Sequence, residues 1–126
     1  MSLSKHVDIE IDERTTSNIQ FEYLDASTGL PKDLTGYSAL LQIREREEFE
    51  TVLLELSTDN GRIVLGGDQG TITATFQPDD TDFSLPNKIR WFVGFYDLYL
   101  KNTGDNTITR FCGGLITVRR GISRGL

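Results

Sequence analysis

Residues 57–76, STDNGRIVLGGDQGTITATF, carry the two glycine clusters that decide how the chain folds, Asn60-Gly61 and Gly66–Gly70. Apolar residues recur at every second position on both sides of the second cluster, at Ile63 and Leu65 before it and at Ile72, Ala74 and Phe76 after it. This period of two is typical of strands with one buried face. Asn-Gly suits the positive φ of a tight hairpin turn, and Gly66–Gly70 suits a wider turn. We therefore predict a meander of three strands, in residues 52–56, 63–65 and 72–76.

The same glycines do not match a ligand-binding loop. A calcium-binding hand needs Asp at alternate positions and a terminal Glu, but Asp59-Asn60-Gly61 continues as Arg-Ile-Val-Leu. The glycine-rich repeat of calcium-binding β-rolls has a different spacing and stacks in copies, whereas GGDQGT occurs once. A phosphate-binding loop leads into a helix, and the residues after Gly70 alternate as in a strand. We expect no metal and no cofactor.

The period of two recurs along most of the chain. The apolar rows are Val7, Ile9 and Ile11; Ile19, Phe21 and Tyr23; Tyr37, Ala39, Leu41 and Ile43; Val52, Leu54 and Leu56; Ile89, Trp91, Val93 and Phe95; and Ile108, Cys112, Ile116 and Val118. Turn-forming residues separate these rows, most densely in QPDDTDFSLPNK (77–88) and KNTGDNT (101–107). About eight short strands at this spacing predict an all-β fold, an antiparallel sandwich or barrel.

Residues 38–56 allow a second interpretation, a helix. The stretch ALLQIREREEFETVLLEL (39–56) is rich in helix formers and in Glu–Arg pairs. Its apolar residues, including Leu40, Leu41 and those at 52–54, would not fall on one helical stripe. We favour strands and keep the helix as the alternative.

Length and charge bound the class of protein. The 126 residues fit one domain with one core, so we assign residues 1–126 to a single domain. A net charge of −6 with mostly scattered Lys and Arg opposes nucleic-acid binding. No window has the roughly 18 apolar residues that a transmembrane helix needs, and the first residues lack the apolar core of a secretory signal. We therefore expect neither a membrane nor an export route.

The chain offers few residues for catalysis. His6 is the single histidine and lies near a terminus, and Cys112, the single cysteine, lies among apolar residues and excludes an internal disulfide. We interpret them as a solvated histidine and a buried thiol. The carboxylates Asp79, Asp80 and Asp82 fit a turn, because Asp caps backbone N–H groups there. We expect no enzyme, and hydrolysis of glycosides by two carboxylates is the enzymatic alternative.

Aromatic residues are concentrated in residues 91–99. Alternation places Trp91, Phe95 and Tyr99 on one face of a strand and Phe92 and Tyr96 on the other. One face must be core, and we interpret Trp91 as core, so its replacement by alanine should cost about 3–5 kcal/mol. As a possible interaction surface we mark Phe92 and Tyr96, together with Ile122 and Arg124 of a tail at 120–126 that we expect to be flexible.

Three stretches resemble a family of small proteins encoded among the structural genes of tailed bacteriophages and prophages: DLTGYSALLQIR (33–44), VLLELSTDNGRIVLGGDQGTITATFQPDDT (52–81) and FCGGLITVRRGISR (111–124). The family's Tyr-Asp-Leu signal is matched by Tyr96-Asp97-Leu98, and the resemblance covers residues 33–124. It implies an immunoglobulin-like β-sandwich, similar in plan to the N-terminal domain of the phage upper baseplate protein. The family supplies no catalytic residues.

The resemblance also implies a function, namely a structural role in the virion, in the tail or baseplate, after synthesis in the host cytoplasm. The expected partners are other virion proteins, and a homo-oligomer is left open. A carbohydrate-binding module that recognises host-surface glycans through the aromatic strand is the alternative function.

Overall fold

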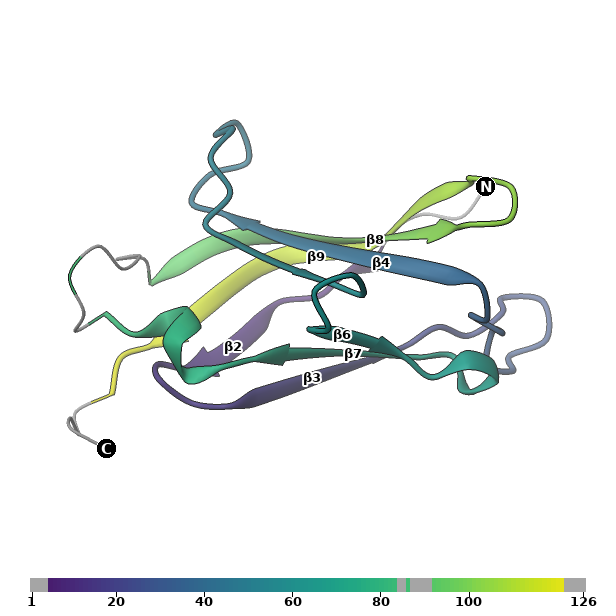
Figure 1. Ribbon diagram of the computed structural model, residues 1–126, viewed down its shortest axis with the longest axis horizontal. Helices are drawn as coiled ribbons and strands as arrows, with labels where there is room; N and C mark the ends of the chain where they lie inside the picture. The colour runs from purple at the N-terminus through teal and green to yellow at the C-terminus, as the bar shows by residue number, and fades with distance from the viewer. Residues whose placement is uncertain (1–4, 84–85, 87–91, 122–126) are drawn as a thin grey trace.

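The computed structural model describes residues 5–83, 86 and 92–121, which form two β-sheets packed face to face (Figure 1). The strands are β1 (Lys5–His6), β2 (Ile9–Asp12), β3 (Ser17–Glu22), β4 (Tyr37–Arg44), β5 (Leu54–Ser57), β6 (Ile63–Leu65), β7 (Thr71–Phe76), β8 (Val93–Asn102) and β9 (Ile108–Arg119). Two short 3-10 helices are also present, η1 (Gly67–Gln69) and η2 (Pro78–Thr81). The predicted all-β sandwich is confirmed, with nine strands in the described residues.

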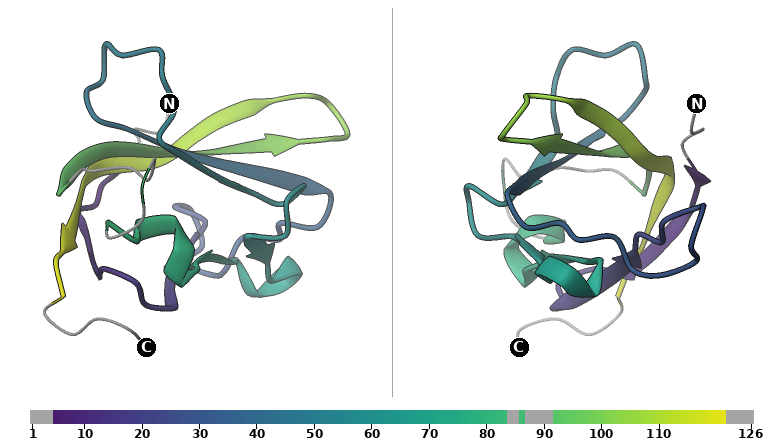
Figure 2. Two further views of the ribbon diagram at one scale, coloured as in Figure 1. Left: turned by 60° about the vertical axis from the view of Figure 1, so that its left-hand side comes forward. Right: turned by 90° about the vertical axis from the view of Figure 1, so that its right-hand side faces the viewer.

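The larger sheet has the strand order β1-β9-β8-β4-β5, with β2 also paired to β9, and the smaller sheet has the order β3-β7-β6. Figure 2 shows the two layers from two further sides. Strands β1 and β2 run parallel to β9, so the larger sheet is mixed and not purely antiparallel as predicted. Alternation tells which side chains share a face, but it carries no information on strand direction.

The core lies between the two sheets and is built from their inward rows. Predicted inward residues that are buried include Ile9, Ile11, Ala39, Leu41, Ile43, Ile72, Ala74 and Phe76. Residues 38–56 form β4, a connection and β5, so the helical alternative is wrong. Strands form here because the side chains of residues 39, 41 and 43 are all buried in the core, and a helix would not place residues two apart on the same face.

The two glycine clusters of residues 57–76 form connections of different kinds, one within a sheet and one between the sheets. Gly66–Gly70 joins β6 to β7 as the predicted wide turn. Gly70 has φ +70°, and a Cβ there would lie 2.7 Å from the carbonyl oxygen of Tyr23, so only glycine fits. The Asn60-Gly61 turn does not form a hairpin, because β5 pairs with β4 and β6 pairs with β7. The predicted three-strand meander is wrong, and this turn carries the chain from one sheet to the other.

The side chain of Asn60 closes the free edge of β5. Its Oδ1 accepts a hydrogen bond from the Ser57 N–H (2.9 Å), and its Nδ2 donates to the Glu55 carbonyl (3.0 Å). In β5 the backbone groups of Leu54 and Leu56 bond to β4. Those of the alternate residues, Glu55 and Ser57, therefore point away from β4. The Ser57 carbonyl also accepts from the Arg62 N–H (3.1 Å). The carboxamide therefore stands in for the peptide group of a neighbouring strand.

A β-bulge reverses the faces of β9. Leu98 pairs with Cys112 but Tyr99 pairs with Arg110, which leaves Phe111 as the extra residue. Phe111 and Cys112 are both buried. In the part of β9 before Phe111, the residues that would point inward by continuing the row of Cys112 point outward instead. Ile108, predicted on the inward row of Cys112, is instead 63% exposed.

Candidate binding surface

The outer faces of the two sheets differ in chemistry. On the smaller sheet, Thr71, Thr73 and Thr75 of β7 pair with Glu22, Gln20 and Asn18 of β3, and the exposed large apolar side chain is Val64. On the larger sheet, five large apolar side chains are 36–63% exposed: Leu40, Val93, Tyr99, Ile108 and Leu115. The larger sheet therefore presents the candidate binding surface.

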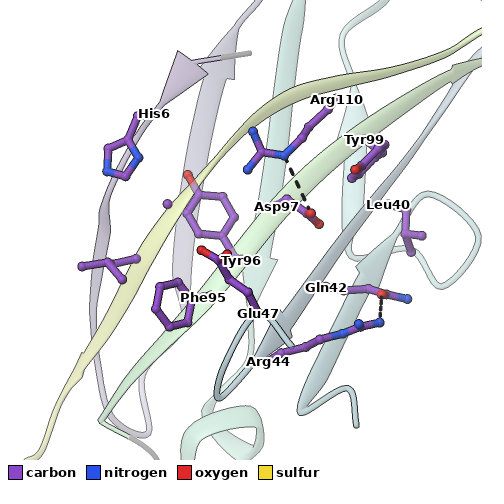
Figure 3. A pocket seen from close by; sticks show the side chains of 12 residues that line it. His6, Leu40, Gln42, Arg44, Glu47, Phe95, Tyr96, Asp97, Tyr99 and Arg110 are labelled. Atoms are coloured by element: carbon purple, nitrogen blue, oxygen red, sulfur yellow. Dashed lines mark hydrogen bonds and ion pairs between the residues drawn. The ribbon is translucent and has the colours of Figure 1, made fainter. Parts of the chain in front are cut away.

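A hollow of about 660 Å³ lies on this surface (Figure 3). Strands β1, β4, β8 and β9 and the connection after β4 line it with His6, Leu40, Gln42, Arg44, Glu47, Phe95, Tyr96, Asp97, Tyr99, Arg110, Gly114 and Leu115. The connection, which includes Glu47, rises above the sheet (Figure 2). It is fixed to the sheet by Arg44, whose Nη1 donates to the Phe49 carbonyl (3.2 Å). The hollow is thus walled on one side by a loop.

Polar side chains cross the middle of the hollow. Asp97 lies opposite Gln42 in the ladder, and its Oδ2 lies 3.8 Å from the Nε of Arg110 (Figure 3). Gln42 accepts from Nη2 of Arg44 (3.0 Å) and donates from Nε2 to Oε1 of Glu55 (2.8 Å). The row contains both donors and acceptors with orientations set by neighbours, so it favours a ligand with several hydrogen-bonding groups.

Partial burial raises the pKa of the Asp97 carboxyl, while the positive charges of Arg110 and Arg44 act in the opposite direction. A carboxylate in this setting can accept hydrogen bonds from hydroxyl or amide groups.

Apolar side chains flank the polar row at both ends. Phe95 and Leu115 form a cross-strand pair at one end, and Leu40 and Tyr99 form one at the other. Beyond Tyr99 a second hollow of about 540 Å³ continues toward Ile108. The surface is therefore a polar strip between two apolar ends.

Gly113 leaves room for this placement of Arg110, because a Cβ at this position would overlap the guanidinium group where it now lies. Without a side chain at Gly113, Arg110 lies across β9 toward Asp97. Gln42, Arg110 and Gly113 did not stand out in the sequence. The signal for Gly113 is the Gly-Gly pair inside an otherwise apolar strand, which indicates a close approach.

Two of the sequence-predicted surface residues are described, and they lie apart. Tyr96 is 3% exposed, and its hydroxyl donates to the Val7 carbonyl, so its assignment to an exposed surface is wrong. Phe92 is exposed as expected, but it lies outside the hollow and stacks on the buried Phe83 with ring centroids 5.4 Å apart. Ile122 and Arg124 lie outside the described residues.

The aromatic strand alternates as predicted, but its two faces are exchanged. Phe95 and Tyr99 point outward, and Tyr96 points inward with Leu98 and Leu100. Alternation separates the two rows without telling which row is inside, and both rows here contain aromatic residues. Trp91 lies outside the described residues.

The residues considered for catalysis are not brought together. His6 points outward and pairs with Asp8 (Nε2–Oδ1 2.9 Å), whereas Cys112 points into the core. Burial raises the pKa of the Cys112 thiol. The turn predicted around Asp79, Asp80 and Asp82 is confirmed: η2 lies there, and Asp80 accepts from the Gln77 N–H (2.7 Å) and pairs with Arg62.

The described part of the chain contains neither a cluster of metal-binding side chains nor a helix that could span a membrane. Three or more His, Cys, Asp or Glu side chains do not meet there in a group that fits a metal ion. The helices in residues 5–83, 86 and 92–121 are too short and too polar to cross a membrane.

Comparisons with known proteins give little further guidance. No protein-family model matches the sequence, and no curated protein matches it. Among solved structures, the chain is similar to dimeric latent PorU from Porphyromonas gingivalis, with 14% sequence identity and a TM-score of 0.41. The match covers 97% of this chain and 11% of the PorU chain. A likeness at this level supports no functional argument.

Proposed function

We propose that the protein is a non-enzymatic structural module that binds another protein through the outer face of its larger sheet. The observation that carries the proposal is the contrast between that face, with five exposed large apolar side chains, and the polar outer face of the smaller sheet. Exposed apolar patches that folding does not require are typical of protein-binding surfaces. The sequence resemblance suggests the assembly, a phage virion, with the tail or baseplate as its place.

The layout of the surface suits a protein partner. Its apolar ends, around Leu115 and Ile108, provide desolvated contact area, and the central strip with Asp97 and Arg110 provides directional hydrogen bonds. Protein interfaces combine these two elements, and Tyr and Arg contribute a large share of their binding energy. Tyr99 and Arg110 are neighbours in the ladder and are the residues that we expect to contribute most.

Immunogold electron microscopy of intact particles tests the virion assignment. Antibodies against this chain, applied to particles from cells that carry its gene, should label the tail or baseplate. Particles that contain the other virion proteins but show no label would contradict it.

A specific observation favours carbohydrate binding as the second candidate. The outward rings of Phe95 and Tyr99 flank Asp97 on the same strand, and Gln42 lies beside it. Aromatic faces contact the apolar side of a sugar ring, and carboxylate and amide groups bind its hydroxyls.

A glycan array distinguishes the two candidates. Carbohydrate binding predicts that the wild type binds particular glycans and that Tyr99→Ala loses this binding. Val64→Ala, on the other sheet, is the control and should bind as the wild type does. A wild type that binds no glycan would remove this candidate.

A further inference from the structure

The sandwich has four sheet edges, and they differ in how well they are closed. In the larger sheet, Asn60 closes β5, and the opposite edge is interrupted between β1 and β2. In the smaller sheet, β6 is only three residues long. The remaining edge is β3 (Ser17–Glu22), with six residues, an unbroken register, no proline and no lysine. A covered edge, an interruption, a short strand, proline and lysine all normally keep an edge strand from pairing with another chain, and β3 has none of these features.

The outward backbone groups of β3 belong to Asn18, Gln20 and Glu22. The Tyr23 N–H donates to the Gly70 carbonyl (2.8 Å), so Tyr23 and alternate residues before it bond to β7. The N–H and C=O groups of Asn18, Gln20 and Glu22 therefore point away from β7. Within residues 5–83, 86 and 92–121, these six groups have no hydrogen-bond partner. The edge is open to another strand.

We propose that a second copy of this chain occupies the edge, with β3 pairing antiparallel to the partner's β3 around a two-fold axis at Gln20. In this register Gln20 faces the partner's Gln20, and Asn18 faces the partner's Glu22. All six outward groups of each chain then pair within one continuous ladder. The two smaller sheets become one six-stranded sheet with an isologous interface.

Side chains favour a second copy over an unrelated strand. Glu22 is the single ionisable residue of β3, and the register places it opposite Asn18, so no like charges face each other. On the face of β3 that points to the core, the half-buried Ile19 lies opposite the partner's Phe21, so two apolar side chains pack against each other across the interface. An arbitrary extended peptide satisfies the backbone groups alone, whereas a second β3 matches both faces.

This interface is separate from the proposed binding surface. It uses the edge of the smaller sheet and leaves the hollow around Asp97 and Tyr99 on the larger sheet uncovered. Dimerisation therefore does not rest on the proposed function, and either can fail alone.

Sedimentation velocity of the whole chain tests the proposal. Mass action predicts that the fraction of chains in the dimer rises as the protein concentration is raised from about 1 to about 100 µM. A chain that sediments as a monomer throughout this range would overturn the proposal.

Variants test the register. Asn18→Glu places a second glutamate opposite Glu22 at both ends of the ladder and should give the monomer at concentrations where the wild type is a dimer. Within one chain, residues 18 and 22 are about 13 Å apart, so the repulsion requires the dimer. Asn18→Gln is the matched control and should remain a dimer. Adding Glu22→Lys to Asn18→Glu should restore the dimer by pairing opposite charges.

Gln20→Pro is an independent test, because it removes the central outward N–H, which the monomer does not use. Circular dichroism should report an unchanged sheet content, and sedimentation should report the monomer. A dimer that persists in both Asn18→Glu and Gln20→Pro uses another surface and overturns the proposal. Failure of Glu22→Lys to restore the dimer of Asn18→Glu would contradict the pairing of residues 18 and 22.

Discussion

The outward residues of the two sheets carry different chemistry over the same core. On the smaller sheet, Gln20 donates to Thr73 (3.4 Å) and Thr75 donates to Asn18 (2.8 Å), so polar side chains satisfy one another across strands. On the larger sheet, Leu40 and Tyr99 face each other, partly exposed. A sandwich needs apolar residues on its inner faces only. Folding therefore does not explain the apolar side chains on the outer face of the larger sheet, and the binding function that we propose would account for them.

The largest expected effect separates folding from binding on a single strand. Leu41 is fully buried and Leu40 beside it points outward, so the two leucines are matched in size and in local structure. Leu41→Ala should lower the free energy of unfolding by about 2–5 kcal/mol, whereas Leu40→Ala should cost about 0.5–1 kcal/mol. Urea denaturation measures both. Equal losses would mean that Leu40 contributes to folding as much as Leu41 does, and would contradict the claim that the outer apolar side chains are not needed for folding.

The next effect concerns association through the larger sheet. Leu115→Lys places a charge at one apolar end of the surface and should weaken incorporation into particles about tenfold or more, without loss of fold. Val64→Lys places the same charge on the outer face of the smaller sheet and should be incorporated as well as the wild type. Quantitative immunoblots of purified particles measure both. Normal incorporation of Leu115→Lys would contradict the assigned face.

A smaller effect tests the closed edge of β5 against the open edge of β3. Asn60→Ala removes the two carboxamide bonds to Glu55 and Ser57, whose freed groups then turn to water. We expect a loss of about 1 kcal/mol of unfolding free energy, measured by thermal denaturation. Asn18→Ala, at the open edge, removes a side-chain bond but no backbone closure, and its cost in the monomer should be lower. The reverse order would contradict the role of Asn60.

The smallest effect concerns Asp97. Burial raises the pKa of this carboxyl in the folded state, so its ionisation opposes folding once the pH rises above the ordinary value of 3.8. Asp97→Asn should therefore raise the melting temperature slightly at neutral pH, and the difference should vanish below about pH 3. The gain should be about a few tenths of a kcal/mol, because the side chain is 40% exposed and paired with Arg110. A lower melting temperature at neutral pH would show that the pair with Arg110 dominates.

Alternation predicted the sandwich because it reports directly on which residues share a face. It identified the inward rows of β4 and β7 and the strand character of residues 38–44. It did not predict the bulge that turns Ile108 outward, since one extra residue reverses a row without changing its composition. The Asn-Gly turn was also misread, because the positive φ of Gly61 suits a crossing between sheets as well as a hairpin.

The candidate surface was harder to predict than the fold. The aromatic strand has rings on both faces, so the sequence could not tell that Tyr96 is core and that Phe95 and Tyr99 point outward. Gln42 meets Asp97 through ladder pairing between β4 and β8, which are far apart in the sequence, and Arg110 reaches Asp97 diagonally from β9; local sequence encodes neither contact.

Hydroxyl-radical footprinting of the protein in its assembled state tests the central claim most directly, namely that the outer face of the larger sheet is the binding surface. Reactivity of Leu40, Tyr99 and Leu115 in intact particles should fall well below that of the free chain, while Val64 on the smaller sheet should react equally in both. Unchanged reactivity of the three larger-sheet residues, or protection of Val64 in their place, would contradict the claim.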